Sequence, residues 1–473
     1  MKRLFRYDII LIVVTAILSR LPLLLSDNLF MDGDECIMGL MAKHFYEGRE
    51  FPLFFYGQSY GFSLFEILPV SLFYSIFGVS LTAVKLAMLG LWIAGLVFFY
   101  KAMLQMGEAK HKREALMITL LFIFLPSYSL WSMKARGGYL TAFFLSSFVL
   151  YLLFHPKWKK SVATAFITGL LLSLIFQSQA LWLAGLLPFL IYVLYRQKVQ
   201  YIMALSAGTA GGIIIFHFLK THLSAYWSPV IWKSPDLSSG NLVSLLKTLY
   251  THMLGTYNYS SMLTPVWVTQ ALAVVFIFFI FFTLMAGIYF LITGKKLKPL
   301  FYVACTSVLL SMGYMFFIMA DFRYLLPLTG YALLMIYLFL INIKPKKTVD
   351  ILWVAMILAG LISNYHFKNY TFNNMRAKQK LINDLKAQNI KYVYSEDGLL
   401  QWEIMFHTNE EIIARSKPET DRYPRYVRLV DHALKAEKSK TALVGYDKKG
   451  YYIIKNPSKS LLREHGFQFA REN

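Results

Sequence analysis

Charged residues are scarce in this chain of 473 residues, at 16% of the total against about 25% in soluble globular proteins. Apolar residues make up 57% and aromatic residues 17%, so an ordinary soluble protein is excluded. The two cysteines rule out a disulfide framework and a Cys-based zinc site. The sequence also has no P-loop, no GxGxxG and no HExxH motif.

Acidic residues are the rarer charged type, with 26 Asp and Glu against 48 Lys and Arg, a net charge of +22. In a soluble protein this excess would favour a nucleic-acid partner. Membrane proteins carry basic cytoplasmic loops for another reason, and we expect no nucleic acid to bind. Up to Tyr365 the chain has 28 basic and 13 acidic residues, and the remainder has 20 and 13.

Long apolar runs fill the first 365 residues and predict a polytopic α-helical membrane protein, because a spanning helix needs about 20 mostly apolar residues. The eleven predicted spans are 8–26, 82–103, 115–132, 137–154, 161–178, 180–196, 200–219, 266–293, 299–320, 322–342 and 349–365. The run 62–77 is shorter and contains Glu66 and Pro69. We expect it to lie in the interface.

The basic residues between the spans support this arrangement. With 62–77 kept from crossing, eighteen charges fall on one face, which the positive-inside rule makes cytoplasmic. They are Lys2, Arg3, Arg6, Lys101, Lys110, Lys112, Arg113, Lys157, Lys159, Lys160, Arg196, Lys198, Lys295, Lys296, Lys298, Lys344, Lys346 and Lys347. The sequence therefore predicts a multi-pass protein of the cell (inner) membrane, with its amino terminus inside and its carboxyl terminus outside.

Two domains are expected: a membrane domain, 1–365, with an acidic outer loop at 27–81, and a small extracytoplasmic α/β domain at 366–473. This tail is predicted to contain helices at 374–389, near 400–407 and at 424–437. Its strands are predicted at NIKYVYSE, TALVGY and YYIIK, with a further apolar run in EEIIA. Apolar residues at helical spacing in 240–254 predict an amphipathic helix on the outer surface.

Three acidic residues, Asp32, Asp34 and Glu35, stand together after the first span and open a predicted helix, 35–47, which Gly48 would end. One interpretation is structural, because Asp32 and Glu35 have the spacing of a capping box. The other is catalytic: a carboxylate in a low-dielectric setting can accept a proton from a hydroxyl. A divalent metal is ranked lower, and we expect no cofactor.

Aromatic and amide side chains follow in FPLFFYGQSYGFSLFEILP, among them Gln58 and Tyr60. We interpret these two as substrate-binding residues, and an aromatic belt at the membrane interface is the alternative. Lys85 stands near the outer end of a span, where burial without a partner is costly. Asp34, Glu66 or a phosphate are the partners considered for it.

The order of these features resembles the glycosyltransferase C (GT-C) superfamily. The nearest likeness is to family 39, the protein O-mannosyltransferase-like enzymes and the aminoarabinose transferases. The resemblance rests on an acidic pair that opens an outer helix, on FGVSLTAVKLAM, on WSMKARGGYLTAFF and on DFRYLLPL. It implies a GT-C type fold with interfacial helices at 35–47 and 62–77. It also implies that Asp34 is catalytic, with Glu35 and Asp32 beside it.

The same resemblance assigns substrate-binding roles to Arg136, Tyr139, Arg323, Tyr324 and Lys85. An arginine fork suits a lipid phosphate. The alternative for both arginines is snorkelling to the interface, and Arg323 has Asp321 as another partner. The family's second carboxylate is missing after Tyr139, because Leu140 and Thr141 stand there.

The resemblance implies a membrane glycosyltransferase that works on the outer face. Its donor would be a sugar linked to a polyprenyl phosphate. Its acceptor would be a hydroxyl of a glycan, lipid or protein, and membrane lipids would surround it. Transfer would invert the anomeric centre, with Asp34 as the base. A transporter or flippase for lipid or polysaccharide is the alternative, although such proteins usually place ionisable residues near the bilayer midplane. A structural membrane protein is a third interpretation.

Overall fold

A computed structural model describes residues 2–58, 61–107, 109–156, 158, 161–195, 197–223, 240–255, 265–294, 297–313, 322–343, 347–369, 375–448 and 450–469. Its membrane part contains α1 (Lys2–Leu24), α2 (Gly33–Tyr46), α3 (Leu64–Phe77), α4 (Leu81–Gly107), α5 (Lys112–Phe124), α6 (Tyr139–Phe154), α7 (Val162–Gln179), α8 (Leu181–Leu194), α9 (Val199–Leu223), α10 (Gly240–Leu254), α11 (Trp267–Ile292), α12 (Pro299–Gly313), α13 (Leu326–Ile343) and α14 (Lys347–His366). Its tail contains α15 (Met375–Ala387), β1 (Tyr392–Ser395), α16 (Leu400–His407), β2 (Ile413–Arg415), α17 (Pro424–Ala436), β3 (Thr441–Asp447), β4 (Gly450–Lys455) and α18 (Lys459–Glu464).

Each of the eleven predicted spans contains a helix in the structure, namely α1, α4–α9 and α11–α14. Among the described residues, seven helices are long and apolar enough to cross a membrane, or eight if a bent pair counts as one span. Helices α6, α8 and α12 are apolar but have only 16, 14 and 15 residues, whereas a span usually has about 17–25. The chain is a multi-pass membrane protein, and the number eleven stays a prediction.

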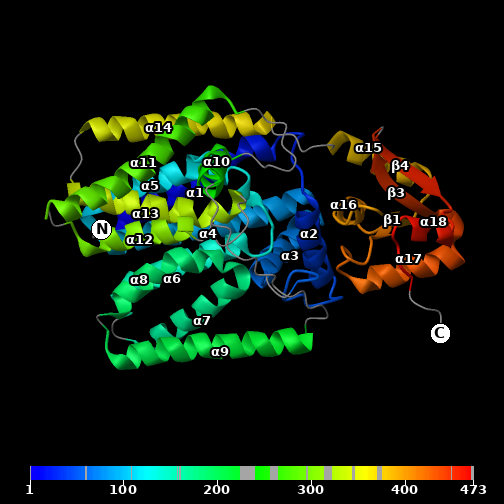
Figure 1. Ribbon diagram of the computed structural model, residues 1–473, viewed down its shortest axis with the longest axis horizontal. Helices are drawn as coiled ribbons and strands as arrows, with labels where there is room; N and C mark the ends of the chain where they lie inside the picture. Colours follow the sequence, from blue (N-terminus) through cyan, green and yellow to red (C-terminus); the bar gives the residue numbers. More distant parts are fainter. Residues whose placement is uncertain are drawn as a thin grey trace.

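Helices α13 and α11 of the bundle (Figure 1) differ in how far they are buried. Of the most apolar 18 residues of Phe322–Ile343, which contains α13, 94% are buried, whereas 33% of the most apolar 18 residues of α11 are buried. Helix α11 exposes large apolar side chains, among them Phe278, Phe282 and Met285. Lipid tails solvate such a face without penalty, because they are as apolar as the side chains. The exposed face of α11 is therefore the surface expected of a lipid-facing helix.

The predicted span 115–132 is wrong as one continuous helix. Helix α5 ends at Phe124, and the chain bends by 60° at the short helices that begin with Pro126. Proline has no N–H to donate and forces the preceding residue out of the helical region. The buried side chain of Arg20 in α1 donates to the freed carbonyl of Ile123 at 2.9 Å. The Asn364 side chain donates to the neighbouring Phe124 carbonyl at 2.8 Å, so buried side chains satisfy the break.

Helices α2 and α3 lie between the bundle and the tail (Figure 1). Helix α2 is followed, as predicted, by Gly48 in a left-handed conformation (φ 68°). Helix α3 spans 14 residues within the predicted run 62–77, too few to cross a bilayer unaided. The two interfacial helices expected from the sequence are therefore present as helices.

Helix α10 has the predicted amphipathic pattern, but its apolar face meets protein. Leu245, Leu249 and Met253 are buried, and α10 packs against α11 and the short helix at Phe322–Leu325. Tertiary packing, rather than an open membrane surface, accounts for this apolar stripe.

The tail folds as the predicted α/β unit. Its four strands have the order β2-β1-β3-β4, with β1 parallel to both β2 and β3, and with β4 antiparallel to β3. Helix α18 is an element that the sequence pattern did not predict. Crossovers between parallel strands place helices on the sheet, and α16 and α17 are those crossovers. Helix α16 packs against α2 of the membrane part.

Small residues on α2 bring the tail close to it. A side chain at Gly33 would collide with Leu399, and one at Gly39 would collide with the ring of Phe406. Glycine at both positions therefore permits α16 to lie directly on α2. The first turns of α2, which carry the acidic residues, are thus placed under the tail.

A buried polar contact fixes this docking. The Glu410 carboxylate, 6% exposed, lies 2.6 Å from the Lys43 ammonium and 3.2 Å from His44 Nε2. Arg49 and Tyr426 also donate to it, at 3.0 and 2.7 Å. Burial would raise the pKa of Glu410, but its bonds to His44 and Lys43 outweigh this and hold the pKa well below its ordinary value of 4.5.

We expect the docking to weaken in acid. Because the pKa of Glu410 is lower folded than unfolded, its contribution is present above about pH 4.5 and is lost as the pH falls further. Glu410→Gln should lower stability by about 1–3 kcal/mol at neutral pH and flatten this acid dependence. Thermal melting from pH 7 to 3 measures both effects. The neighbouring exposed Glu411→Gln is the control, and equal melting curves for the two variants would contradict the prediction.

Candidate active site

The acidic residues after α1 form the N-terminal cap of α2. The Asp32 carboxylate accepts from the Glu35 amide at 3.0 Å, and the Asp32 amide donates to the Glu35 carboxylate at 3.3 Å. This is the capping box that the spacing predicts. Asp34 takes no part in the box. The cap therefore accounts for two of the three acidic residues and leaves the third to be explained.

Four cations surround the same carboxylates. Lys134 lies 2.7 Å from Asp32 and 3.7 Å from Glu35, and Lys85 lies 2.6 Å from Glu35. Arg136 spans two carboxylates, at 3.0 Å from Asp32 and 2.7 Å from Asp34. The fourth cation is Arg422, from the tail, at 3.4 Å from Asp34. We name these seven residues the charge cluster: Asp32, Asp34, Glu35, Lys85, Lys134, Arg136 and Arg422.

Exposure separates the three carboxylates. The side chain of Glu35 is fully buried, that of Asp32 is 7% exposed and that of Asp34 is 16% exposed. Burial would raise the pKa of Asp32, but the charges of Lys134 and Arg136 outweigh it and hold that pKa well below its usual range. Asp32 is thus an ion-paired anion, and Asp34 is the carboxylate that a substrate can most easily reach.

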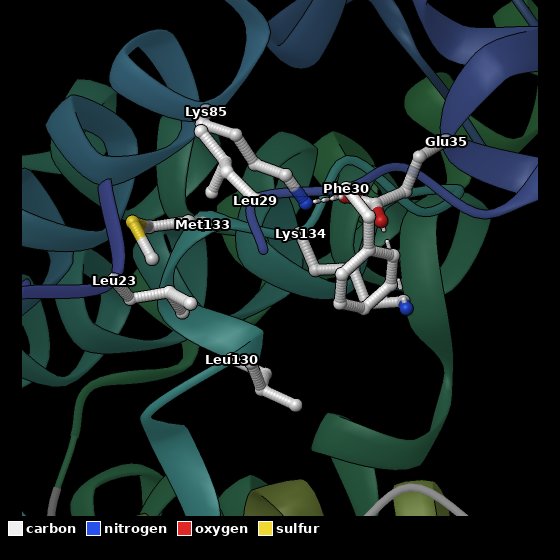
Figure 2. A pocket seen from close by; sticks show the side chains of 8 residues that line it. All are labelled: Leu23, Leu29, Phe30, Glu35, Lys85, Leu130, Met133 and Lys134. Atoms are coloured by element: carbon white, nitrogen blue, oxygen red, sulfur yellow. Dashed lines mark hydrogen bonds and ion pairs between the residues drawn. The ribbon is translucent and has the colours of Figure 1, made fainter. Parts of the chain in front are cut away.

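A cavity opens beside the charge cluster (Figure 2). It is lined by Leu23, Leu29, Phe30, Glu35, Lys85, Leu130, Met133 and Lys134. Lys85 and Lys134 approach Glu35 from separate elements, α4 and the turn before α6 (Figure 2). The remaining walls are apolar. Its polar lining consists of two ammonium groups and one carboxylate.

The turn 134–138 presents two of the cations. Gly137 and Gly138 both have positive φ, 54° and 91°, which glycine alone adopts readily. The Gly138 amide donates to the buried carboxylate of Glu66 in α3 at 2.8 Å. Glu66 thereby ties α3 to the turn that carries Lys134 and Arg136.

The structure brings together Asp32, Asp34, Glu35, Lys85 and Arg136 of the residues selected from the sequence. The partner of Lys85 is Glu35 rather than Asp34 or Glu66, because α4 reaches Glu35 from the bundle side. No site residue was expected at Lys134 or Arg422. Lys134 stands two residues before Arg136 in the same motif, so its spacing was a usable signal, but Arg422 carries no local signal.

The other selected residues contact different parts of the molecule. Tyr139 opens α6 and packs its ring 5.0 Å from that of Trp131. The Arg323 guanidinium lies over the Tyr324 ring at 5.1 Å and bonds to the Tyr324 hydroxyl. The backbone N–H of Gln58 donates to the Phe55 carbonyl. Tyr60, and Asp321 as a partner for Arg323, lie outside the described residues.

Within the described ranges, no set of three or more His, Cys, Asp or Glu side chains is placed to hold a metal ion. The oxygens of the charge cluster instead face ammonium and guanidinium groups.

Several solved structures are similar to this one. The oligosaccharyltransferase of Archaeoglobus fulgidus, in complex with zinc and sulfate, has a TM-score of 0.52 at 12% identity, over 92% of this chain and 67% of that one. ArnT from Cupriavidus metallidurans, bound to undecaprenyl phosphate, has a TM-score of 0.49 at 13% identity, over 95% of this chain and 98% of that one. The arabinofuranosyltransferase AftD from Mycobacteria has 0.40 at 12% identity, over 84% and 30%.

These likenesses concern the fold. The match to the archaeal enzyme establishes that the chain has the GT-C type of fold predicted from the sequence. No protein-family model and no curated protein sequence matches the chain. The function is therefore inferred from the charge cluster and its surroundings.

Proposed function

We propose that the protein is an integral membrane glycosyltransferase, with the charge cluster as its active site. The observation that carries this proposal is the position of Asp34. It is the most exposed of three clustered carboxylates. It belongs to a charge cluster whose Glu35, Lys85 and Lys134 line a cavity with otherwise apolar walls, on a GT-C type of fold.

The proposed donor is a sugar linked to a polyprenyl phosphate. The charge cluster sets four cations against three carboxylates, and a cation-rich setting of this kind suits a phosphate. Lys85 and Lys134 line the cavity and supply ammonium groups to a phosphate, while the leucines and Met133 suit the first isoprenyl units. A water-soluble sugar nucleotide would make no use of these apolar walls.

The proposed chemistry is a direct displacement. The acceptor hydroxyl gives its proton to the Asp34 carboxylate as its oxygen bonds to the anomeric carbon. The bond between that carbon and the phosphate oxygen breaks, and its electron pair leaves with the lipid phosphate. Lys85, Lys134 and Arg136 stabilise the charge of the departing phosphate. Attack opposite the leaving group inverts the anomeric centre, and the proton on Asp34 later passes to solvent.

The ion pairs of the clustered carboxylates also indicate whether the site needs a metal ion. Asp32 and Glu35 are already ion-paired with lysine and arginine, so we propose that transfer needs no resident metal. The acceptor is a hydroxyl of a glycan, lipid or protein on the outer face of the cell membrane. The tail covers that same face in this topology.

Mass spectrometry of cell-envelope glycolipids and glycoproteins tests the proposal. Cells lacking the protein should lose one glycoconjugate and accumulate its polyprenyl-phosphate-linked donor. Purified protein added to membranes of those cells should restore the product, and EDTA should not prevent it. An unchanged set of glycoconjugates would contradict the proposal. Donor lipid confined to the inner leaflet of the deletion cells would instead indicate a flippase.

A further inference from the structure

The tail contributes one residue to the charge cluster. Arg422 stands just before α17, and its Nη1 donates to Asp34 Oδ1 at 3.4 Å. Its guanidinium also lies over the Phe55 ring at 5.5 Å. Asp34 is therefore held by two arginines from opposite sides, by Arg136 of the membrane part through Oδ2 and by Arg422 of the tail through Oδ1.

The backbone around Arg422 is fixed rather than free. The Asp421 carboxylate accepts from the amides of Ser416 and Tyr423, which closes the turn. The Tyr423 ring stacks on Tyr56 at 4.8 Å, and its hydroxyl bonds to Glu50. Arg422 thus reaches Asp34 from a preorganised turn that is attached to the outer loop.

Gly57 shows how closely that loop and Arg422 fit. Gly57 has φ 71°, and a side chain there would meet the Cβ and Cγ atoms of Arg422 at 2.7 Å. The loop therefore packs directly against the aliphatic part of the Arg422 side chain. Arg422 is a quarter exposed, so it lies at the edge of the site where an acceptor would enter.

We propose that Arg422 is a positioning residue for Asp34, and that the tail is thereby an integral part of the active site. This inference rests on the proposed function and adds the residue that the tail supplies to it. Arg136 and Arg422 together fix the carboxylate in one orientation, with its remaining lone pairs directed to the acceptor.

The inference predicts a specific kinetic change. Arg422→Ala should lower kcat by roughly 10- to 100-fold, because a misplaced catalytic group can cost about that much, while KM for the donor stays the same. Arg422→Lys keeps the charge and should restore the rate to within about 3-fold.

Membranes from cells lacking the protein, which supply accumulated donor and unmodified acceptor, are the substrate for this assay. Arg428→Ala, an exposed arginine of α17, is the matched control and should behave like the wild type. Thermal melting checks that the Arg422 variants remain folded. Arg422→Ala with wild-type kcat would overturn the inference, as would a lysine variant as slow as the alanine variant.

The same experiment separates this inference from the proposed function. If Asp34→Asn is inactive and Arg422→Ala is normal, the inference fails and the proposed function stands. If Asp34→Asn transfers sugar normally, the base assignment fails, and with it the role of Arg422. If the wild-type protein restores no product, both fail.

Discussion

Replacement of Asp34 by asparagine should abolish sugar transfer, with kcat reduced by about 10³-fold or more, because general bases contribute about 10²–10⁴ to a rate. Asparagine has nearly the same shape and can still accept a hydrogen bond from Arg136, which now lies 2.7 Å from the carboxylate. It cannot take a proton from an acceptor hydroxyl. The rate is measured with purified protein and membranes of cells that lack it.

Folding must be preserved for this result to have meaning. Asp34 is partly exposed and takes no part in the capping box, so its substitution should leave the melting temperature within a few degrees of the wild type. Glu47→Gln, at the other end of α2 and in an exposed ion pair with Arg49, is the control and should transfer sugar within about 2-fold of the wild-type rate. A fully active Asp34→Asn would show that another group accepts the proton.

Much of the fold could be predicted because it follows from local patterns. Apolar runs mark helices whatever their neighbours are, so all eleven predicted segments contain one. The break after α5 was missed because hydropathy counts Pro126 as one residue among many. Its cost is offset by Arg20, more than one hundred positions away in the chain. Whether the apolar face of α10 meets protein or the membrane surface likewise depends on helices elsewhere in the chain.

The acidic residues of the candidate site could be predicted from the local sequence pattern. Scarcity made the acidic residues of the outer loop stand out, and their spacing predicted the capping box that the structure has. Their cationic partners come from three distant segments, and Arg422 is 388 positions from Asp34. No periodicity in a single sequence relates such positions. Glu66 was noted as a charge within an apolar run and as a partner considered for Lys85, whereas in the structure it supports the turn that carries Arg136.

Loss of the Glu35 charge should destabilise the protein by about 3–5 kcal/mol, the usual cost of removing one partner from a buried ion pair. Glu35 is fully buried between Lys85 and Lys134, so Glu35→Gln leaves ammonium groups uncompensated in a low-dielectric site. Thermal melting in detergent is the measurement. Lys134 keeps Asp32 as a partner at 2.7 Å, so most of the loss should come from Lys85.

A second substitution isolates that loss. Lys85→Met removes the stranded charge, and the double variant Glu35→Gln/Lys85→Met should be more stable than the sum of the single effects by about 1–3 kcal/mol. The double variant should nevertheless bind the donor poorly, with a raised KM, because Lys85 no longer faces the lipid phosphate. If the double variant recovers stability and keeps a normal KM, Lys85 has a structural role and does not bind the donor. Additive single effects would show that Glu35 and Lys85 do not depend on each other, contrary to the 2.6 Å contact between them.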